Sequence, residues 1–512
     1  MGKLHKPALA LLAVLLILAS NGFQTALNTQ RKNDERLGLG QSSGLENAPP
    51  LLAFTTVALG GFRGVIANAL WIRATKLQDE GRFFEMAQLS DWITKLEPHF
   101  AAVWANRAWN MAYNISVRFS SPMDRWRWVK QGVELLRDEG LRYNPHDALI
   151  YRELGFTFQH KMGYFLDEAH QFYKAAWFAE MTTAMGGGAT NLAELIQPVT
   201  DDARNRVKIL KEHYKLDPAL MGEVEAKYGK LEWRLPEPHA IYWGYVGLKN
   251  CPDNALNHDR LIDLRRLIYQ CMAALVIRVK ISNFTQDGYP VTSPRFDLIE
   301  VTHKAFEDLA REEKTAKGYS IMVAHRNFVR EMIYQLYAAN RIAEAERWFK
   351  LVRERYPDFT DGQTKMEPYA LGRLQELIQD GNYQRTKSIL LGFIQSQVYA
   401  EALDEEDNVL HYEYLAQTLY TRFMAKYGGT DRIKLQDFSD IQREVLCDLL
   451  NPETGLYPHL AARVMSRRKI SSYTNLCAQT FTLPNTNSLE RLTNRVNAVN
   501  PEGPGGAVIP RK

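Results

Sequence analysis

Cysteine is scarce in this chain, and the short motifs that mark common catalytic or metal sites are absent. The four cysteines, Cys251, Cys271, Cys447 and Cys477, form no CxxC, no CxxCH and no Cys/His cluster, which argues against structural zinc and c-type haem. We expect one disulfide at most, with isolated buried thiols otherwise. No Walker A loop, G-x-S-x-G elbow, HExxH or GxGxxG occurs either. We therefore predict that the chain is not an enzyme, and we assign no catalytic, cofactor-binding or metal-binding residue and no cofactor.

The chain also lacks an excess of one charge. Its 63 basic and 59 acidic residues leave a net charge of +4 over 512 residues, which argues against a dedicated nucleic-acid binder. Gly 32 and Pro 21 are too few for a collagen-like or low-complexity chain, and 46% hydrophobic with 24% charged residues is ordinary for a folded protein. The length predicts two to four domains or one long repeat array.

One long hydrophobic run stands at the N-terminus. Pro7–Ala19 contains thirteen residues without a polar side chain, preceded by Lys3 and Lys6, the layout of a secretory signal or a signal anchor. Continuing to Leu27 reaches the length of about 20 residues that spans a bilayer. We favour an uncleaved anchor formed by residues 7–27 over a cleaved signal. Both readings export the rest of the chain, with the N-terminus inside.

A second, nearly apolar segment runs from Leu51 to Trp71, with Arg63 at its centre. An ionised group in the middle of a bilayer costs at least about 2.5 kcal/mol. We therefore interpret the segment as the buried first helix of the folded body. A second membrane span is the alternative.

The body shows helical periodicity and signs of an internal repeat. Residues 151–158 read YRELGFTF, which has the layout W-x2-L-G-x2-Y of the first helix of a tetratricopeptide repeat, with aromatic substitutions. Ala169, Tyr173 and Ala176 have the small–large–small spacing of its second helix. Gly155 and Ala169 are expected to let two helices approach closely.

A second unit is expected around residues 327–357. Ala345, Phe349 and Pro357 have the offsets of the second helix and the closing proline, and Asn340 occupies the turn. Weaker units flank both. About three repeats are needed for a stable stack; the alternative is an irregular α-helical bundle that matches by chance.

These residues resemble a tetratricopeptide-like helical-repeat protein. The stretches 59–100, 108–119, 124–145 and 151–163 further resemble an uncharacterised family of membrane-anchored bacterial envelope proteins. The resemblance covers about residues 1–250 well. It implies an all-α, tetratricopeptide-like solenoid with an N-terminal membrane anchor helix. The implied location is the inner (cytoplasmic) membrane, single-pass, with the body in the periplasm or outside; no reaction is implied.

Tetratricopeptide modules bind extended peptides or helices along a groove lined by their first helices. Carried over by repeat position, the resemblance implies a partner groove whose arginines could hold carboxylates and whose aromatic residues could stack on a partner. Its expected residues are Arg152, Phe156, Gln159, His160, Asn327, Arg330, Tyr334 and Tyr337.

The predicted organisation follows the chain from the anchor to a disordered tail. Residues 276–299 within the helical middle block are expected to form a small hairpin. The segments are the anchor 1–30, a linker 31–55, repeats 56–200, the middle block 201–318, repeats 319–430, C-terminal helices 431–482 and the tail 483–512.

We expect a membrane-anchored scaffold that mediates protein–protein interaction on the export side of the membrane, with envelope or membrane proteins as partners and no nucleic acid. One alternative is a small-molecule or enzymatic site in block 201–318, which a buried charged cluster in a pocket there would favour. The other is a structural subunit of an envelope secretion or transport assembly, which an exposed apolar face on Leu51–Trp71 would favour.

Overall fold

The structure is a computed structural model that describes residues 62–477 apart from short gaps, together with residues 22–23, 26–27 and 29–30. The gaps are 165–166, 188–190, 279, 283–290, 313–315, 361, 380 and 429–434. The predicted anchor 7–27 falls almost wholly outside the described residues, as do the linker 31–55 and the tail 483–512. Within the described part of the chain, no helix is long and apolar enough to cross a membrane.

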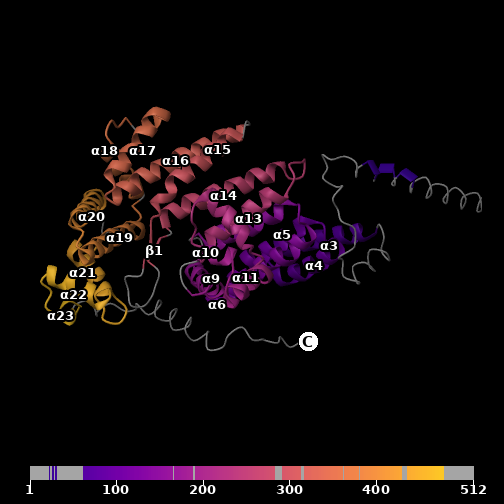
Figure 1. Ribbon diagram of the computed structural model, residues 1–512, viewed down its shortest axis with the longest axis horizontal. Coiled ribbons are helices and arrows are strands. Elements are labelled where there is room, and N and C mark those ends of the chain that lie inside the picture. Colours follow the sequence, from indigo (N-terminus) through magenta and orange to yellow (C-terminus); the bar gives the residue numbers. More distant parts are fainter. Residues whose placement is uncertain are drawn as a thin grey trace, which may run out of the picture. The chain divides into compact units, whose positions relative to one another are not determined.

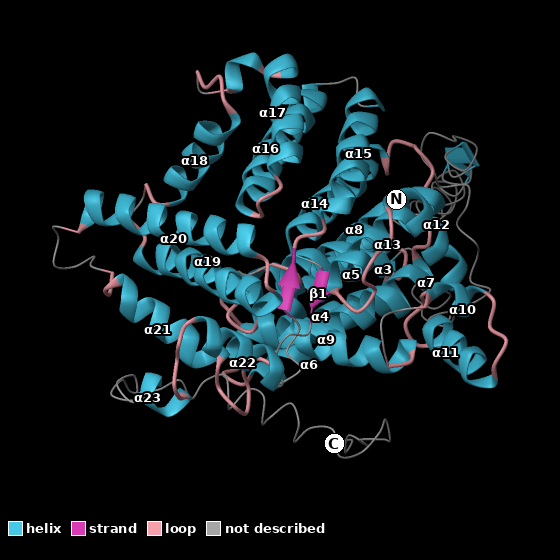
Figure 2. Cartoon of the chain, turned by 60° about the vertical axis from the view of Figure 1, so that its left-hand side comes forward, coloured by secondary structure: helices cyan, strands magenta, loops and turns pink. Residues whose placement is uncertain are grey.

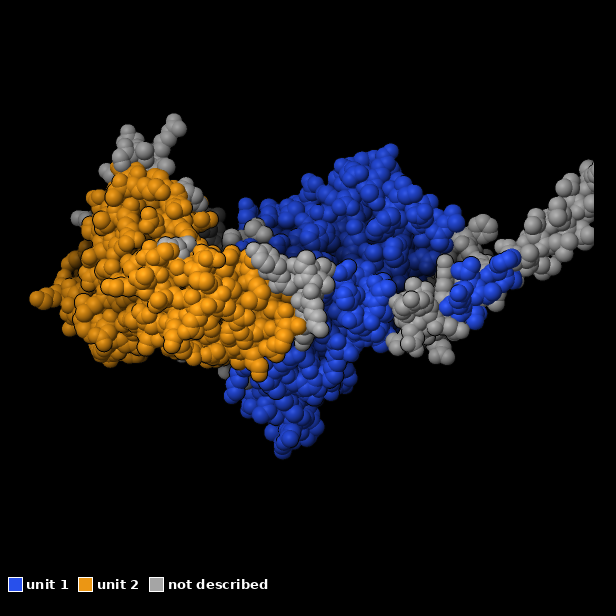
Figure 3. Space-filling view, turned by 90° about the horizontal axis from the view of Figure 1, so that it is seen from above, with its two compact units in different colours: residues 1–272 blue, residues 273–512 orange. Residues whose placement is uncertain are grey.

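Helices make up almost all of the described structure, which confirms the all-α prediction (Figures 1 and 2). The chain divides into two compact units, residues 1–272 and 273–512 (Figure 3). The boundary falls inside the predicted middle block, within a single helix, α14 (His258–Arg278). Residues 201–272 of that block therefore belong to the first unit.

The first unit consists of α-helices interrupted by π-helical and 3-10 turns. Its described elements before α14 are α3 (Phe62–Asp79), α4 (Phe83–Leu96), α5 (Ala101–Trp109), η4 (Asn110–Ile115), η5 (Ser116–Arg118), α6 (Pro122–Glu134), η6 (Leu135–Gly140), α7 (Leu141–Tyr143), α8 (Ala148–Phe156), η7 (Thr157–Met162), α9 (His170–Met185), α10 (Leu192–Ile196), α11 (Asp201–Glu212), α12 (Pro218–Tyr228) and α13 (Pro236–Asn250).

Local sequence explains where several of these helices begin and end. Asp147 caps α8 by accepting a hydrogen bond from the Leu149 amide, and Thr200 caps α11 in the same way from the Ala203 amide. Pro218 and Pro236 stand in the first turns of α12 and α13, where a missing N–H costs nothing. Gly186 ends α9 in the left-handed region, with φ 98°.

Helix α13 lies between α8 and α14 because two of its residues are glycines. A Cβ on Gly247 would meet Tyr151 Cβ of α8 and Leu264 Cδ1 of α14 at 2.8 Å, and one on Gly244 would meet Ile268 Cγ1 at 2.8 Å. Real Cβ atoms do not approach so closely. A larger residue at either position would force the three helices apart.

Gly155 serves a close helix contact, but with other neighbours than the sequence suggested. A Cβ there would collide with Leu267 Cδ2 of α14 and would lie 3.3 Å from the Ala240 carbonyl oxygen of α13. Ala169 is the residue that precedes α9 rather than a position within it. Gly155 therefore allows α13 and α14 to approach α8 closely.

Helix α3 contains the described part of the apolar segment Leu51–Trp71, because residues 51–61 lie outside the described residues. Ala67, Ala74 and Leu77 are buried, in two clusters shared with α4 and α5. On its other side Val65 and Ile72 are 66% and 65% exposed. The expectation of a buried helix thus holds for one face of α3 only.

Beyond α14, the described part of the second unit contains nine α-helices, two 3-10 turns and a hairpin. Its described elements are β1 (Lys280–Ser282), β2 (Val291–Ser293), η8 (Phe296–Leu298), α15 (Ile299–Glu312), α16 (Ala316–Ala338), α17 (Ile342–Arg355), η9 (Pro357–Phe359), α18 (Met366–Leu377), α19 (Tyr383–Leu403), α20 (Glu406–Tyr427), α21 (Phe438–Leu449), α22 (Pro458–Arg467) and α23 (Tyr473–Cys477).

The hairpin occupies the segment in which the sequence analysis expects one. Strands β1 and β2 pair antiparallel, with Ile281 opposite Thr292. Helices α16 and α17 then form an antiparallel pair around Asn340, which adopts φ 59° in the turn. Ala345 and Phe349 are buried on α17.

A disulfide joins α21 to α23. Cys447 and Cys477 are bonded across a sequence separation of 30 residues, with their Cα atoms 5.7 Å apart, whereas Cys251 and Cys271 are free and buried. Burial raises the pKa of both free thiols, so neither is a reactive nucleophile.

We predict that Cys447→Ser lowers the stability of the C-terminal helices by about 3–4 kcal/mol, because the bond closes a loop of this length. Hydrogen exchange of α21 and α22 in increasing urea measures the change. Dithiothreitol should destabilise the natural chain equally and leave Cys447→Ser unaffected. Equal exchange in both chains without reductant would contradict the prediction.

Candidate functional site

Four of the predicted groove residues lie together where α8 passes into the π-helical turn η7. Arg152, Phe156, Gln159 and His160 are all partly exposed there, since their spacing places them on one side of the continuous helix. Single π-helical turns inside helices are frequent at functional sites. Lys161 follows His160 in this turn and is buried, with 4% of its surface exposed.

Aromatic rings stack along this side of the unit. The Trp109 ring lies 4.0 Å from that of Tyr113 and 6.0 Å from that of Phe156, and Phe156 lies 4.8 Å from His160, with interplanar angles of 11° to 15°. The His160 ring lies 6.2 Å from that of Tyr164 at 14°. We call these five residues, Trp109, Tyr113, Phe156, His160 and Tyr164, the aromatic strip. Trp109 is 39% and Tyr164 43% exposed.

Polar side chains border the strip. The Arg152 guanidinium lies over the Phe156 ring, 5.5 Å from its centre, and pairs with Glu153. The Gln159 side chain donates a hydrogen bond to Gln270 Oε1 at 3.0 Å. The strip thus combines apolar faces with hydrogen-bonding groups, the composition of a recognition surface.

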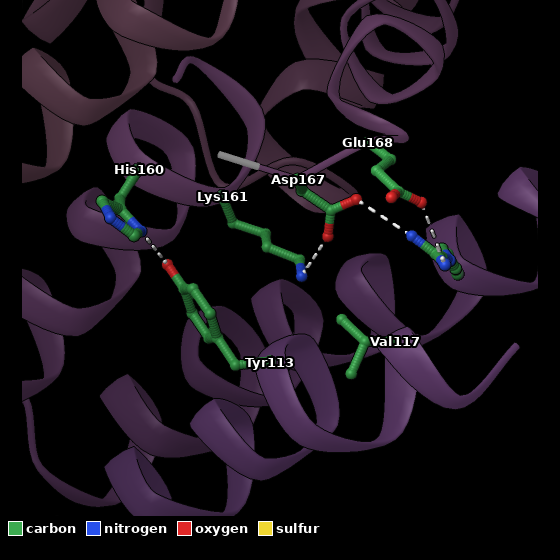
Figure 4. A pocket seen from close by; sticks show the side chains of 7 residues that line it. Tyr113, Val117, His160, Lys161, Asp167 and Glu168 are labelled. Carbon is green, nitrogen blue, oxygen red and sulfur yellow. Dashed lines mark hydrogen bonds and ion pairs between the residues drawn. The ribbon is translucent and has the colours of Figure 1, made fainter. Parts of the chain in front are cut away.

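A cavity of about 400 Å³ opens beside the strip. Figure 4 shows its lining, to which η4, η5, α6, η7 and the segment before α9 contribute: Tyr113, Val117, Arg125, His160, Lys161, Asp167 and Glu168. It therefore lies outside the 201–318 block in which the sequence analysis considered a small-molecule site.

An ion pair forms the floor of the cavity. Lys161 Nζ donates to Asp167 Oδ2 at 2.5 Å, and the two side chains are 4% and 7% exposed. The Lys161 ammonium also lies 5.0 Å from the centre of the Tyr113 ring. Arg125 donates from Nη1 to Asp167 Oδ1 at 3.4 Å and from Nε to the Phe119 carbonyl oxygen at 2.6 Å.

Burial is the largest single influence on the pKa values of the titratable groups in this cavity. It lowers the pKa of Lys161, against the opposing effect of Asp167. Burial acts to raise the pKa of Asp167, but hydrogen bonds from Lys161 and the Ala169 amide outweigh it, so that pKa is lowered. The pKa of His160 is lowered by burial and by the nearby Lys161 charge, and His160 Nδ1 lies 3.1 Å from the Tyr113 hydroxyl. At neutral pH the imidazole is therefore uncharged.

The other four predicted groove residues, on α16, do not form a comparable surface. Asn327 is exposed, but Tyr334 and Tyr337 are buried, and the Tyr337 hydroxyl donates to Glu367 Oε1 at 3.0 Å. Arg330 is paired with Glu376 and lies over the Phe359 ring. This set contributes mostly to packing within the second unit.

Sequence reasoning missed the cavity and its ion pair. Lys161 and Asp167 belong to no known motif. Residues six apart do not share a face of a regular helix, so their spacing predicts no contact between them. The only local signal was the aromatic content of residues 109–113 and 156–164. No group of His, Cys, Asp and Glu suited to hold a metal occurs among the residues that the structure describes.

The comparisons with protein-family models, curated proteins and solved structures found no match for this chain.

Two histidines of the second unit are in contact, His325, which is buried, and His303, which is partly exposed. His303 Nδ1 lies 2.7 Å from His325 Nε2, and His325 Nδ1 lies 2.7 Å from the Tyr356 hydroxyl. His303 Nε2 also lies 3.6 Å from Glu307 Oε2. The pKa of His325 is lowered to about 3 by burial, with smaller effects of His303 and Arg355; burial also lowers the pKa of His303.

We predict that the second unit loses stability as the pH falls from about 6.5 towards 3. In that pH window His325 binds a proton in the unfolded chain but stays neutral in the folded one. The free energy of unfolding therefore falls by up to about 1.4 kcal/mol for each unit by which the pH is lowered. Hydrogen exchange of α15–α17 at pH 7.5 and 5.5, corrected for intrinsic rates, measures the loss. His325→Gln should reduce this pH dependence, whereas His459→Gln, at an exposed position, should retain it. An unchanged dependence in His325→Gln would contradict the assignment.

Proposed function

We propose that the protein is a membrane-anchored helical-repeat scaffold that docks another protein on the export side of the membrane. The observation that carries this proposal is the aromatic strip, a partly exposed row of stacked rings bordered by Arg152 and Gln159. The proposed partners are envelope or membrane proteins.

A tetratricopeptide-like arrangement is the framework we propose for the scaffold. Successive antiparallel helix pairs, α3 with α4 and α5–η4 with α6, precede α8–η7, and α16 pairs with α17 in the second unit. The turn at Asn340 and the buried Ala345 and Phe349 support a repeat at that position. Helix pairs of this kind bury their apolar faces only by stacking on neighbours.

The anchor and the export-side location rest on two independent features. Residues 7–27 have the composition and basic flank of a signal anchor. The Cys447–Cys477 disulfide lies in the body, and disulfides persist mainly in oxidising compartments outside the cytosol.

The strip suits a protein partner because of its residue types. Tryptophan, tyrosine and arginine carry most of the binding energy at protein interfaces. Stacking of Trp109 on Tyr113 and of Phe156 on His160 holds these rings in place before binding, so little side-chain entropy is lost.

A second candidate function is a structural subunit of an envelope assembly, and helix α3 favours it. Val65, Ile66 and Ile72 expose 66%, 39% and 65% of their surface on one side of α3. No acidic residue occurs between Phe62 and Gln78, while Arg73 and Lys76 are exposed. Such a face suits packing against an apolar partner.

Affinity purification of the full chain from gently solubilised membranes tests both candidates. We expect Phe156→Ser with Tyr164→Ser to lower recovery of a stoichiometric partner protein at least about tenfold, since hot-spot truncations cost 2 kcal/mol or more. The matched control is Val199→Ser with Leu256→Ser, which removes apolar side chains 81% and 45% exposed elsewhere in the first unit. A third chain carries Val65→Ser with Ile72→Ser.

The outcomes separate the candidates. Loss of the partner in the strip variant alone supports the docking scaffold. Loss in the α3 variant alone supports the structural subunit and contradicts docking at the strip. Absence of any stoichiometric partner with the natural chain contradicts the scaffold function.

A further inference from the structure

The cavity beside the aromatic strip contains more positive than negative charge below its rim. Lys161 and Asp167 are 4% and 7% exposed, and the Arg125 side chain is 15% exposed. The fourth charge, Glu168, is 92% exposed, with Oε2 3.9 Å from Arg125 Nη2, beyond hydrogen-bond range. Apart from the exposed Glu168, the buried Lys161 and Asp167 and the partly buried Arg125 carry a net charge of +1, whereas charges withdrawn from water are normally matched by partners.

Several N–H donors of Lys161 and Arg125 also have no acceptor among the described residues. The ammonium of Lys161 has three N–H donors, and among the described residues it finds one acceptor, Asp167 Oδ2; its other close neighbours are the faces of the Tyr113 and Tyr173 rings. The Arg125 guanidinium has no hydrogen-bond acceptor within the described chain for Nη2. Both side chains border the same cavity (Figure 4).

We propose that this cavity binds a small organic monocarboxylate, whose carboxylate is held between Arg125 and Lys161 and whose body lies against Tyr113 and Val117. A single negative charge neutralises the buried excess, and two oxygens can accept from the two cations at once. The volume of about 400 Å³ falls within the range of small-molecule sites. The bound anion displaces Glu168 from its loose contact with Arg125.

The apolar part of the lining favours a carboxylate over inorganic phosphate. The Tyr113 ring and Val117, which is 46% exposed, offer a surface that only an organic body can cover. A doubly charged phosphate would also exceed the available positive charge beside Asp167. The cavity shares Tyr113 and His160 with the aromatic strip, but the binding of a small carboxylate and the docking of a protein are measured separately, so either proposal can fail without the other.

Fluorine NMR of 4-fluorobenzoate with the full chain in detergent tests the site. We expect saturable line broadening that excess benzoate reverses and equimolar phosphate does not. Arg125→Gln should weaken binding about tenfold or more, the value of a hydrogen bond to a charged group. Glu168→Gln should strengthen binding about two- to fivefold, because it removes an exposed competitor worth at most about 1 kcal/mol.

Lys130→Gln is the matched control. Lys130 lies on α6 with Arg125 and pairs with Glu180, outside the cavity, so its loss should leave binding unchanged. Lys161 is not substituted alone, because Asp167 would then be buried without its closest partner. Hydrogen exchange of α8 and η7 in Arg125→Gln should match the natural chain, which shows that the loss of binding is not a loss of fold.

Three results overturn the proposal. Broadening that does not saturate means that the probe enters the micelle only. Equal affinity in Arg125→Gln and the natural chain, or no gain in Glu168→Gln, removes the cavity from the binding site. Reversal by phosphate as effective as by benzoate identifies a general oxyanion site and contradicts the carboxylate assignment.

Discussion

The close contact of α13 with α8 and α14 is the constraint on which the first unit depends. At Gly247 the α13 backbone approaches Tyr151 so closely that a single methyl group would not fit. This contact determines where α8 lies, and the π-helical turn η7 continues directly from α8. The position of Phe156 and His160 in the strip, and of the neighbouring Lys161, therefore depends on a packing contact made by residues with no functional chemistry.

Several buried charged or titratable groups in both units are held by specific partners. In the first unit Lys161 is matched by Asp167, and His239, whose pKa burial lowers to about 4, lies 2.7 Å from the Trp233 carbonyl oxygen. In the second unit His303 and His325 share a hydrogen bond. Because an unmatched buried charge is costly, the incompletely matched charge at Arg125 and Lys161 is the feature that points to a ligand.

The strip and the cavity are neighbouring parts of one surface with different chemistry. Tyr113 and His160 belong to both, since their rings join the stack and also line the cavity. Occupancy of the cavity would thus contact rings that a docked protein also contacts.

Much of the secondary structure was predictable because it is encoded locally. Asn340 tolerates a left-handed turn, proline begins α12 and α13, and residues spaced by four and three share a helix face, which is why Arg152, Phe156, Gln159 and His160 lie together. The same spacing rule did not separate exposed from buried faces on α16. Tyr334 and Tyr337 are buried there, and Tyr337 contacts Glu367 and His411, which are distant in sequence.

The sequence by itself determined that the chain is helical, where several helices begin and end, and which residues of α8 and η7 share a face, since these depend on interactions within a few residues. Only the tertiary structure decided the pairing of Cys447 with Cys477, the open face of α3, and the meeting of Arg125, Lys161 and Asp167. These features join residues from different helices or depend on which helix faces stay uncovered. Local periodicity carries no information about such contacts.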